Sequence, residues 1–464
     1  MKIKSNRYSI VLVAITGILS ILYAFTISHV DCNTITTWAY DLLESVKIGE
    51  LRDFPVYTYE THDMATNYTL FSNVINAIWL LPLYLIDVIC GFDFSLIIYD
   101  VYYKVLVLAV MIISYIVMGK ILNKTNFDAV KKNIGLYALG TSSILLMTVL
   151  GKGQIDIFDL LMVILAIYSY LNNKIELSFL FIGIGCLFKP FVLLLGVPYF
   201  LLMIGKSKGK SVINGICLAA PYLIEKGITR LLMPRYNEMS KITSERFAEE
   251  FGTSRMEQIF QLHLNSVLVF IAAALIICFI CLHIGIKGTA TNKDLLFYPL
   301  IMFVSFGIFV DFVAASATYW YAIIVPIMVI IGLQFEKIED FLILNLGINV
   351  GIIFFIPLAE KVLTPAMNFS MLHTLRKYDS PMSVLYGYDS VDYMKMMSAT
   401  LFIICILLIC GVFFFEQMIS KNSDIKETNA DGATMSHINT FTKVLLALTV
   451  VPQIVYLLFI YIIC

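Results

Sequence analysis

The feature that most constrains this chain is a series of apolar segments, most close to the length of a membrane span, that recurs along its whole length. A membrane-spanning helix needs about 20 apolar residues at a rise of about 1.5 Å per residue. Hydrophobic residues make up 59% of the 464 residues and charged residues only 14%, so the chain lacks the polar surface that a water-soluble protein requires. We therefore predict an all-α, polytopic integral membrane protein that forms a single domain over residues 1–464.

The apolar segments predict about 12–13 transmembrane helices, of which those buried in a bundle are shorter than 20 residues. The expected spans are 8–28, 97–118, 134–150, 155–171, 177–188, 190–204, 211–223, 263–285, 295–314, 319–333, 341–357, 396–416 and 441–462. The first span resembles a signal peptide, but it has no small-residue cleavage site and many similar segments follow it. It is predicted to be a retained anchor.

The distribution of lysine and arginine in short loops predicts the orientation of the chain in the cell membrane. Basic residues precede the first span and fill the loop 119–133, so the N-terminus and this loop are expected in the cytoplasm, as is the loop 417–440. The opposite face then receives the first outer loop, 29–96, and the outer loops 224–262 and 358–395. Functional groups are often found on such loops, because a rigid scaffold positions them.

Two apolar segments, 71–90 and 97–118, lie between the acidic first outer loop and the next cytoplasmic loop, although only one crossing fits there. Asn73, Asn76 and Pro82 interrupt the first of these segments. We therefore predict that 71–90 lies along the interface or re-enters, and that 97–118 spans the membrane.

Charge, cysteine and motif content exclude several classes of function. The net charge of -1 gives no basic field for nucleic acid. Eight of the nine cysteines lie in or beside apolar segments and are expected to be small apolar packing residues, while Cys32 lies in a polar loop. No HExxH or paired CxxC motif is found, and Asp31-Cys32-Asn33 is not a DxD motif, so no metal site or cofactor is predicted and a divalent cation has no support.

Several polar residues lie between residues 151 and 202, although burying such residues in a hydrophobic protein costs free energy. Lys152, Gln154 and Asp156 stand at the start of an expected helix behind two glycines, which leave room for a ligand near the backbone. Asp159 falls on the same helical face as Asp156. The alternative is ordinary helix N-terminal chemistry, in which an acid in the first turn complements the helix dipole.

Lys189 precedes Pro190 in the middle of a long, nearly uncharged stretch. Proline removes an amide donor and disfavours helix at the residue before it, so two short helices are expected to meet here. A charge inside the membrane is a functional hypothesis because burying an ammonium is costly. The alternative is a lysine that extends its charged end to the membrane boundary.

Two further groups of charged residues lie in the predicted outer loops. Asp31 closely follows the first span, where a carboxylate could accept a proton as a general base; an interfacial acid without a role is the alternative. Six other acids of the same loop compete for this role: Asp41, Glu44, Glu50, Asp53, Glu60 and Asp63. Arg230 and Arg235 closely follow another span, and guanidinium groups suit phosphate, although helix-surface salt bridges are the more common explanation for such residues.

Several motifs, taken in order, resemble the GT-C superfamily of polytopic glycosyltransferases that use polyprenyl-phosphate sugars, in particular its bacterial mannosyltransferase-like members. They are Asp31 after the first span, WAYDLLESVKIGEL from Trp38, NYTLFSN from Asn67, GQIDIFDLLMVILA from Gly153, CLFKPFVLLLGVPYFLL from Cys186 and YWYAIIVPIM from Tyr319. The resemblance covers residues 8–333. It departs at Asn67-Tyr68-Thr69-Leu70, where members often have a proline-rich run.

The resemblance implies that Asp31 is the catalytic base or acceptor-binding carboxylate, and that Gln154, Asp156 and Lys189 lie near the donor phosphate. Lys152, Arg230 and Arg235 are expected to add positive charge there. The expected activity is transfer of a hexose from a polyprenyl-phosphate donor to a glycan, lipid or protein acceptor outside the cytoplasm. The alternatives are a polysaccharide polymerase or ligase, and a transporter or flippase, which should have paired halves with interrupted helices.

Overall fold

The computed structural model describes residues 7–62, 66, 68–92, 94–205, 209–236, 238–239, 242, 253–311, 318–359, 363–365, 401–414 and 439–463. These residues are almost entirely helical. Five helices are long and apolar enough to cross a membrane, and six shorter apolar helices accompany them in this part of the chain. The predicted all-α, polytopic membrane fold is confirmed. The five long helices cover 70–90, 97–123, 129–151, 267–287 and 440–458.

The chain divides into two compact units, which we describe separately. The first contains residues 1–29, 111–152 and 318–464, and the second contains residues 30–110 and 153–317. The single-domain organisation over 1–464 stays a prediction.

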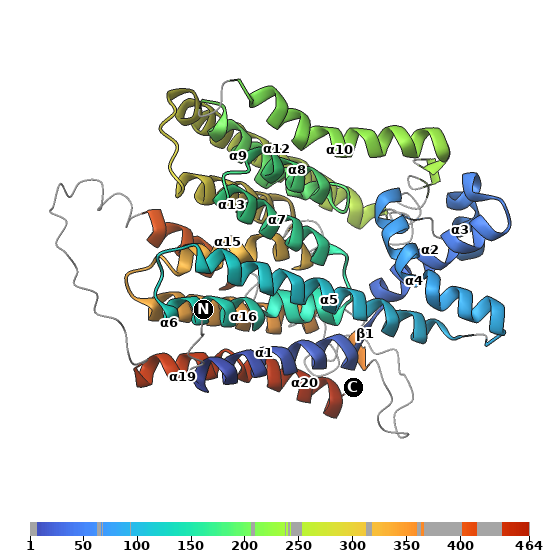
Figure 1. Cartoon of the computed structure of the whole chain (residues 1–464), viewed down its shortest axis with the longest axis horizontal. Coiled ribbons are helices and arrows are strands. Elements are labelled where there is room, and N and C mark those ends of the chain that lie inside the picture. The colour runs from blue at the N-terminus through green and yellow to red at the C-terminus, as the bar shows by residue number, and fades with distance from the viewer. Residues whose placement is uncertain are drawn as a thin grey trace. The chain divides into compact units, whose positions relative to one another are not determined.

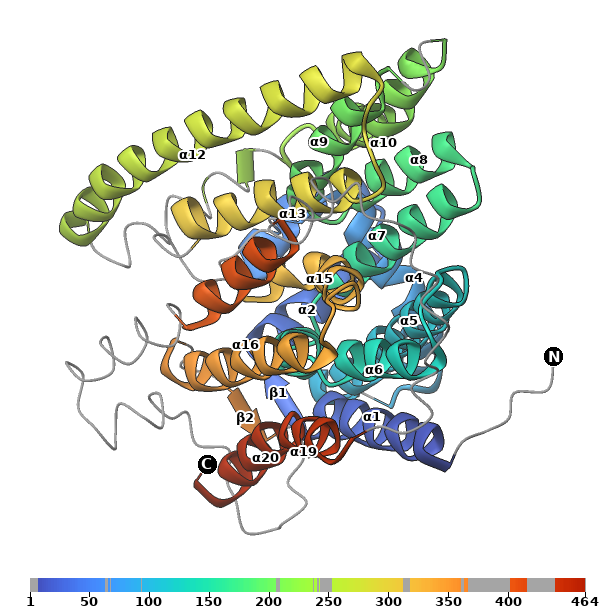
Figure 2. The same cartoon turned by 90° about the vertical axis from the view of Figure 1, so that its left-hand side faces the viewer.

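The first unit is a helical bundle with one short strand pair. Its elements are α1 (Arg7–Thr26), β1 (Ile27–His29), the last part of α5 (Leu96–Asn123), α6 (Ala129–Gly140), η2 (Ile144–Gly151), η5 (Thr318–Ile324), α15 (Val325–Gly332), α16 (Ile338–Ala359), β2 (Leu363–Pro365), a helix over 401–414, α19 (Thr440–Leu448) and α20 (Val451–Ile463). β1 and β2 pair antiparallel, with Ser28 opposite Thr364. In Figures 1 and 2, α16 lies beside α19 and α20, with which it packs.

Side chains replace the backbone hydrogen bonds that are lost where α6 ends and η2 begins. The Gln453 amide donates to the carbonyl of Thr141 at 3.1 Å and to the Ser143 hydroxyl at 2.6 Å, and its oxygen accepts from Tyr23 at 2.9 Å. All of the residues of η2 are buried. An interrupted helix is tolerated inside a membrane protein when neighbouring helices satisfy its polar groups in this way.

The second unit contains the polar residues singled out above, except Lys152. Its elements are α2 (Val30–Lys47), η1 (Leu51–Asp53), α3 (Phe54–His62), α4 (Leu70–Cys90), the first part of α5, α7 (Asp156–Leu171), α8 (Ile175–Gly185), η3 (Pro190–Val192), α9 (Leu193–Met203), α10 (Ser211–Leu232), α12 (Thr253–Lys287), α13 (Asp294–Phe306) and η4 (Gly307–Asp311). Figure 1 shows α10 alongside α8, and Figure 2 shows α12 and α13 near α9; each of these pairs is in contact.

The described part of the segment 29–96, the predicted first outer loop, is mostly helical. α4 covers the segment 71–90 and is long and apolar enough to span, with Pro82 inside it. Its expected course along the interface therefore stays a prediction.

The helix boundaries around the expected loop 224–262 differ from the prediction. α10 continues to Leu232 and α12 begins at Thr253. Glu225 lies within the expected loop, but its side chain is buried and hydrogen-bonded within the unit, and α10 continues past it. Most of the expected loops 358–395 and 417–440 lies outside the described residues.

Candidate functional site

The site begins at the N-terminus of α2, where Asp31 stands in the first turn. A carboxylate there is stabilised by the positive end of the helix dipole. The side-chain amide of Gln154 donates a hydrogen bond to Asp31 Oδ2. Gln154 itself is completely buried. The two residues, 123 positions apart in the sequence, thus meet in one unit.

Gly153 shapes the turn that brings Gln154 to Asp31. Its φ is +66°, a left-handed conformation that favours glycine. A Cβ atom at this position would lie 2.7 Å from Cys32 Sγ and 3.4 Å from Lys104 Cε. The turn therefore requires glycine both for its conformation and for the close packing of α2.

Tyr68 connects Asp31, through Gln154, to the lysine hairpin, which is the turn at Lys189-Pro190 between α8 and α9. Its hydroxyl donates to Gln154 Oε1 at 3.4 Å, and its ring lies 5.1 Å from Lys189 Nζ, in cation–π range. Trp38 of α2 packs its ring edge-to-face with Tyr68 at a centroid distance of 5.3 Å. Burial raises the pKa of Tyr68, so its hydroxyl stays protonated and acts as a donor at neutral pH.

The predicted break at Lys189-Pro190 is confirmed. α8 ends at Gly185, Lys189 is extended (φ -141°, ψ 128°), and η3 begins at Pro190. The stacked rings of Phe158 and Phe188, 4.7 Å apart, fix this hairpin against α7.

Lys189 points into the unit, where it is only 8% exposed. Its Nζ lies 3.4 Å from Asp156 Oδ2 in the first turn of α7. Asp159, one turn further along α7, is also buried. Lys189 is thus paired with a buried carboxylate, and its side chain does not extend its charge to water.

The remaining predicted residues are Lys152, Arg230 and Arg235. Lys152 belongs to the first unit, where it is buried with its ammonium 5.2 Å from the ring centre of Tyr319. Arg230 and Arg235 belong to the second unit and are exposed, and no ion pair or hydrogen bond joins them to the cluster among the described residues. Their predicted roles are untested.

A buried Asp100 and Lys104, one turn apart on α5, were missed in the sequence. Thr36 of α2 donates to Asp100, and Lys104 packs near Gly153. An acid and a lysine four residues apart within an otherwise apolar span were the available signal. Burial raises the pKa of the neighbouring Cys32 thiol, so this cysteine is not an activated nucleophile.

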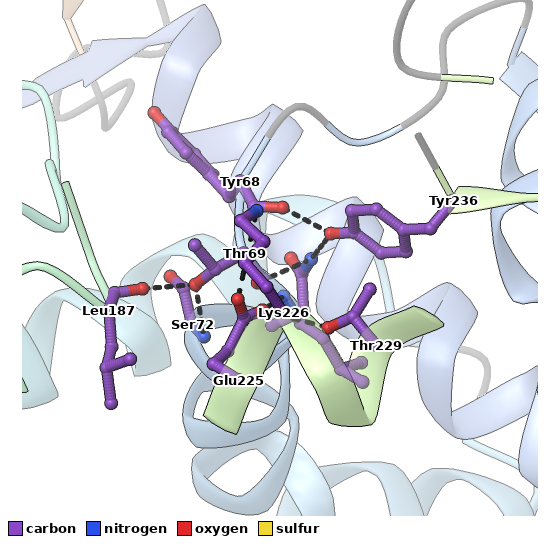
Figure 3. A network of polar contacts seen from close by, with 10 residues as sticks. Tyr68, Thr69, Ser72, Leu187, Glu225, Lys226, Thr229 and Tyr236 are labelled. Carbon is purple, nitrogen blue, oxygen red and sulfur yellow. Dashed lines mark hydrogen bonds and ion pairs between the residues drawn. The ribbon is translucent and has the colours of Figure 1, made fainter. Parts of the chain in front are cut away.

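Figure 3 shows how the segment that carries Tyr68 is held. The Thr69 hydroxyl donates to the Leu187 carbonyl of the lysine hairpin, and Tyr236 donates to the Tyr68 carbonyl. The Glu225 carboxylate accepts from the amide of Leu70 at 3.1 Å. The segment 68–70 is therefore fixed by three different parts of the second unit.

No protein-family model matches the chain, and no curated protein matches it in sequence. Within the part of the chain that the structure describes, no group of three or more histidine, cysteine, aspartate or glutamate residues is arranged to hold a metal ion. The chemistry of the site is therefore argued from its own residues.

Proposed function

We propose that this protein is a membrane glycosyltransferase that moves a hexose from a polyprenyl-phosphate donor to an acceptor on the extracytoplasmic face of the cell membrane. The observation that carries the proposal is the series of contacts from Asp31 through Gln154 and Tyr68 to Lys189. It provides a carboxylate and an ammonium in one unit, joined by an amide and a phenol. Transfer from a phosphate leaving group requires these two kinds of charge.

In the proposed reaction, an acceptor hydroxyl attacks the anomeric carbon of the donor sugar. The bond from that carbon to the phosphate oxygen breaks, and the polyprenyl phosphate leaves with the electron pair. Asp31 takes the proton of the acceptor hydroxyl as general base. The hydrogen bond from Gln154 favours the ionised form of Asp31 and fixes its orientation.

Lys189 is proposed to stabilise the negative charge that develops on the leaving phosphate. Its partner Asp156, 3.4 Å away, offsets the cost of holding an ammonium in a nearly enclosed place before the donor binds. The Tyr68 ring limits where the ammonium can move, because it lies within cation–π range.

The wider proposal follows the sequence resemblance. Arg230 and Arg235 would add positive charge around the donor phosphate, and the acceptor is a glycan, lipid or protein. The N-terminus lies in the cytoplasm, the first outer loop lies outside, and no cofactor takes part.

A transporter is the second candidate, and one observation favours it. Buried charged side chains occur on several helices of the second unit, among them Asp100 and Lys104 on α5 and Asp156 and Asp159 on α7. Such residues in membrane proteins often line substrate or ion pathways.

Reconstitution into sealed vesicles separates the candidates. The purified protein is given a polyprenyl-phosphate hexose labelled in the sugar, and both the label on a soluble or lipid acceptor and the label crossing the vesicle wall are measured. Label joined to an acceptor together with release of polyprenyl phosphate supports the glycosyltransferase. Movement of intact donor without bond cleavage would instead establish transport.

A further inference from the structure

The N-terminus of α4 is fixed by a carboxylate from a distant helix. Glu225 of α10 is 7% exposed, and its Oε1 accepts from the amide of Leu70 at 3.1 Å and from the Thr229 hydroxyl at 2.9 Å. Its other oxygen lies 3.8 Å from Lys226 Nζ.

Thr69 and Glu225 both provide acceptors for the amides at the start of α4. Thr69 caps the helix by accepting from the amide of Ser72 at 3.2 Å, and the carbonyl of Thr69 accepts from the amide of Asn73 at 3.2 Å. Glu225 provides the acceptor for Leu70, which a helix cannot supply for its own first residue. The carboxylate therefore completes the cap that Thr69 begins.

The residue just before this cap is Tyr68, which contacts both Gln154 and Lys189. Its carbonyl accepts from the Tyr236 hydroxyl, which in turn accepts from the side-chain amide of Asn73 at 2.9 Å. Figure 3 shows Glu225, Thr69 and Tyr236 converging on this short segment. A shift of the cap would thus move the Tyr68 ring relative to both functional groups.

We propose that Glu225 is a positioning residue that holds Tyr68 between Gln154 and Lys189 by accepting the hydrogen bonds of Leu70 and Thr229. Glu225 acts through its acceptor oxygen. Its identified contacts in the described part of the chain are with Leu70, Thr229 and Lys226, and none is with Asp31, Gln154 or Lys189. Its effect on sugar transfer rests on the proposed function, but its effect on Tyr68 does not.

The test uses Trp38 as a reporter, because its ring packs against Tyr68. Of the three tryptophans, Trp79 and Trp320 are replaced by phenylalanine in the full-length chain, so that all tryptophan emission comes from Trp38. In this background, Glu225→Ala removes the acceptor, and Glu225→Gln keeps an acceptor oxygen without the charge. Glu176→Ala, which removes a more exposed acid on α8, is the matched control.

Glu225→Ala is expected to change the Trp38 emission spectrum and to lower kcat by roughly tenfold to a hundredfold, because small misplacements in a site have effects of this size. Glu225→Gln and Glu176→Ala should resemble the parent protein in both measurements. Donor and acceptor KM should change less than kcat, because Glu225 itself contacts neither substrate.

An unchanged Trp38 spectrum in Glu225→Ala would overturn the inference, even if activity falls. So would a Glu225→Gln variant as impaired as Glu225→Ala, because charge rather than hydrogen bonding would then be required. If the parent protein transfers no sugar from any polyprenyl-phosphate donor, the proposed function fails, and the spectra alone still decide whether Glu225 positions Tyr68.

Discussion

Asp31 is the residue on which the proposed chemistry most depends, because it is the carboxylate that Gln154 orients. Asp31→Asn preserves size and an oxygen that can accept from Gln154, but it removes the base. Sugar transfer should fall by roughly 10²–10⁴-fold, the usual contribution of a general base, without loss of expression or thermal stability. Asp53→Asn, at an exposed acid in the same loop, is the control and should retain activity. Full turnover by Asp31→Asn would eliminate the assignment.

Lys189 requires a different design, because the structure pairs it with a buried carboxylate. Lys189→Met alone leaves Asp156 without its 3.4 Å partner, which costs about 3–5 kcal/mol in a buried pair. Combining Lys189→Met with Asp156→Asn removes both charges and should recover most of that stability. Donor affinity should remain low in both variants. Thermal unfolding and donor-binding measurements on both variants test this, and wild-type donor affinity in the double variant would exclude phosphate binding by Lys189.

Asp41 gives the protein a stability that depends on pH. Its carboxyl is 3% exposed, and burial raises its pKa, despite the opposing effect of His62 at 3.2 Å. Thr58 also lowers this pKa, and Glu44 raises it. A carboxyl whose pKa is higher in the folded than in the unfolded protein stabilises the fold at pH values below the unfolded pKa of about 3.9. This stabilisation is lost as the pH rises through the folded-state pKa.

Asp41→Asn stays neutral at every pH. The unfolding temperature of this variant minus that of wild type should therefore increase as the pH is raised from about 4 to about 8. Thermal unfolding in detergent at both pH values measures the difference. A difference that does not change with pH would contradict the role assigned to burial.

At the scale of elements, the turn before α7 decides whether Gln154 reaches Asp31. Gly153→Ala meets two costs, a left-handed φ of +66° and a Cβ atom 2.7 Å from Cys32 Sγ. Gly49→Ala is a matched control, because its φ is +80° and the space around it is open. The control should lose about 1–2 kcal/mol from its left-handed conformation alone.

Gly153→Ala should be destabilised more than this control and should also lose sugar transfer, because the turn must move. Chemical unfolding and activity are measured on both variants. Equal destabilisation of the two would show that crowding by Cys32 has no part in the turn.

Several elements could be predicted because their signals are local. Pro190 predicts a break at Lys189, and the start of α7 follows from the glycines before it and the acids in its first turn. The end of α10 could not be predicted in this way. Glu225 looks like a loop residue until its partner, the amide of Leu70, is known, and that partner is 155 positions away.

At the scale of the whole molecule, composition predicts the membrane fold, because only helices or closed barrels satisfy the backbone in lipid. Composition and hydropathy could not predict which residues meet to form the site. Tyr68 meets Gln154 across 86 residues, and the Asp100–Lys104 pair lies in a segment that hydropathy marks only as a span. Hydropathy reports burial along the chain, whereas the site depends on which polar residues of different helices face one another.

The orientation of the chain gives a last prediction. Lys and Arg in short loops place the loop 119–133 in the cytoplasm and the loop containing Glu50 outside. Both Glu50 and Lys124 are exposed, so each accepts a cysteine without disturbing the core. In a chain with its nine native cysteines replaced, Glu50→Cys should react with an impermeant maleimide in intact cells, and Lys124→Cys should react only after the membrane is opened. Because Glu50 follows the same helix α2 that carries Asp31, labelling of Glu50→Cys from the cytoplasm alone would move the proposed chemistry to the wrong face for an external acceptor.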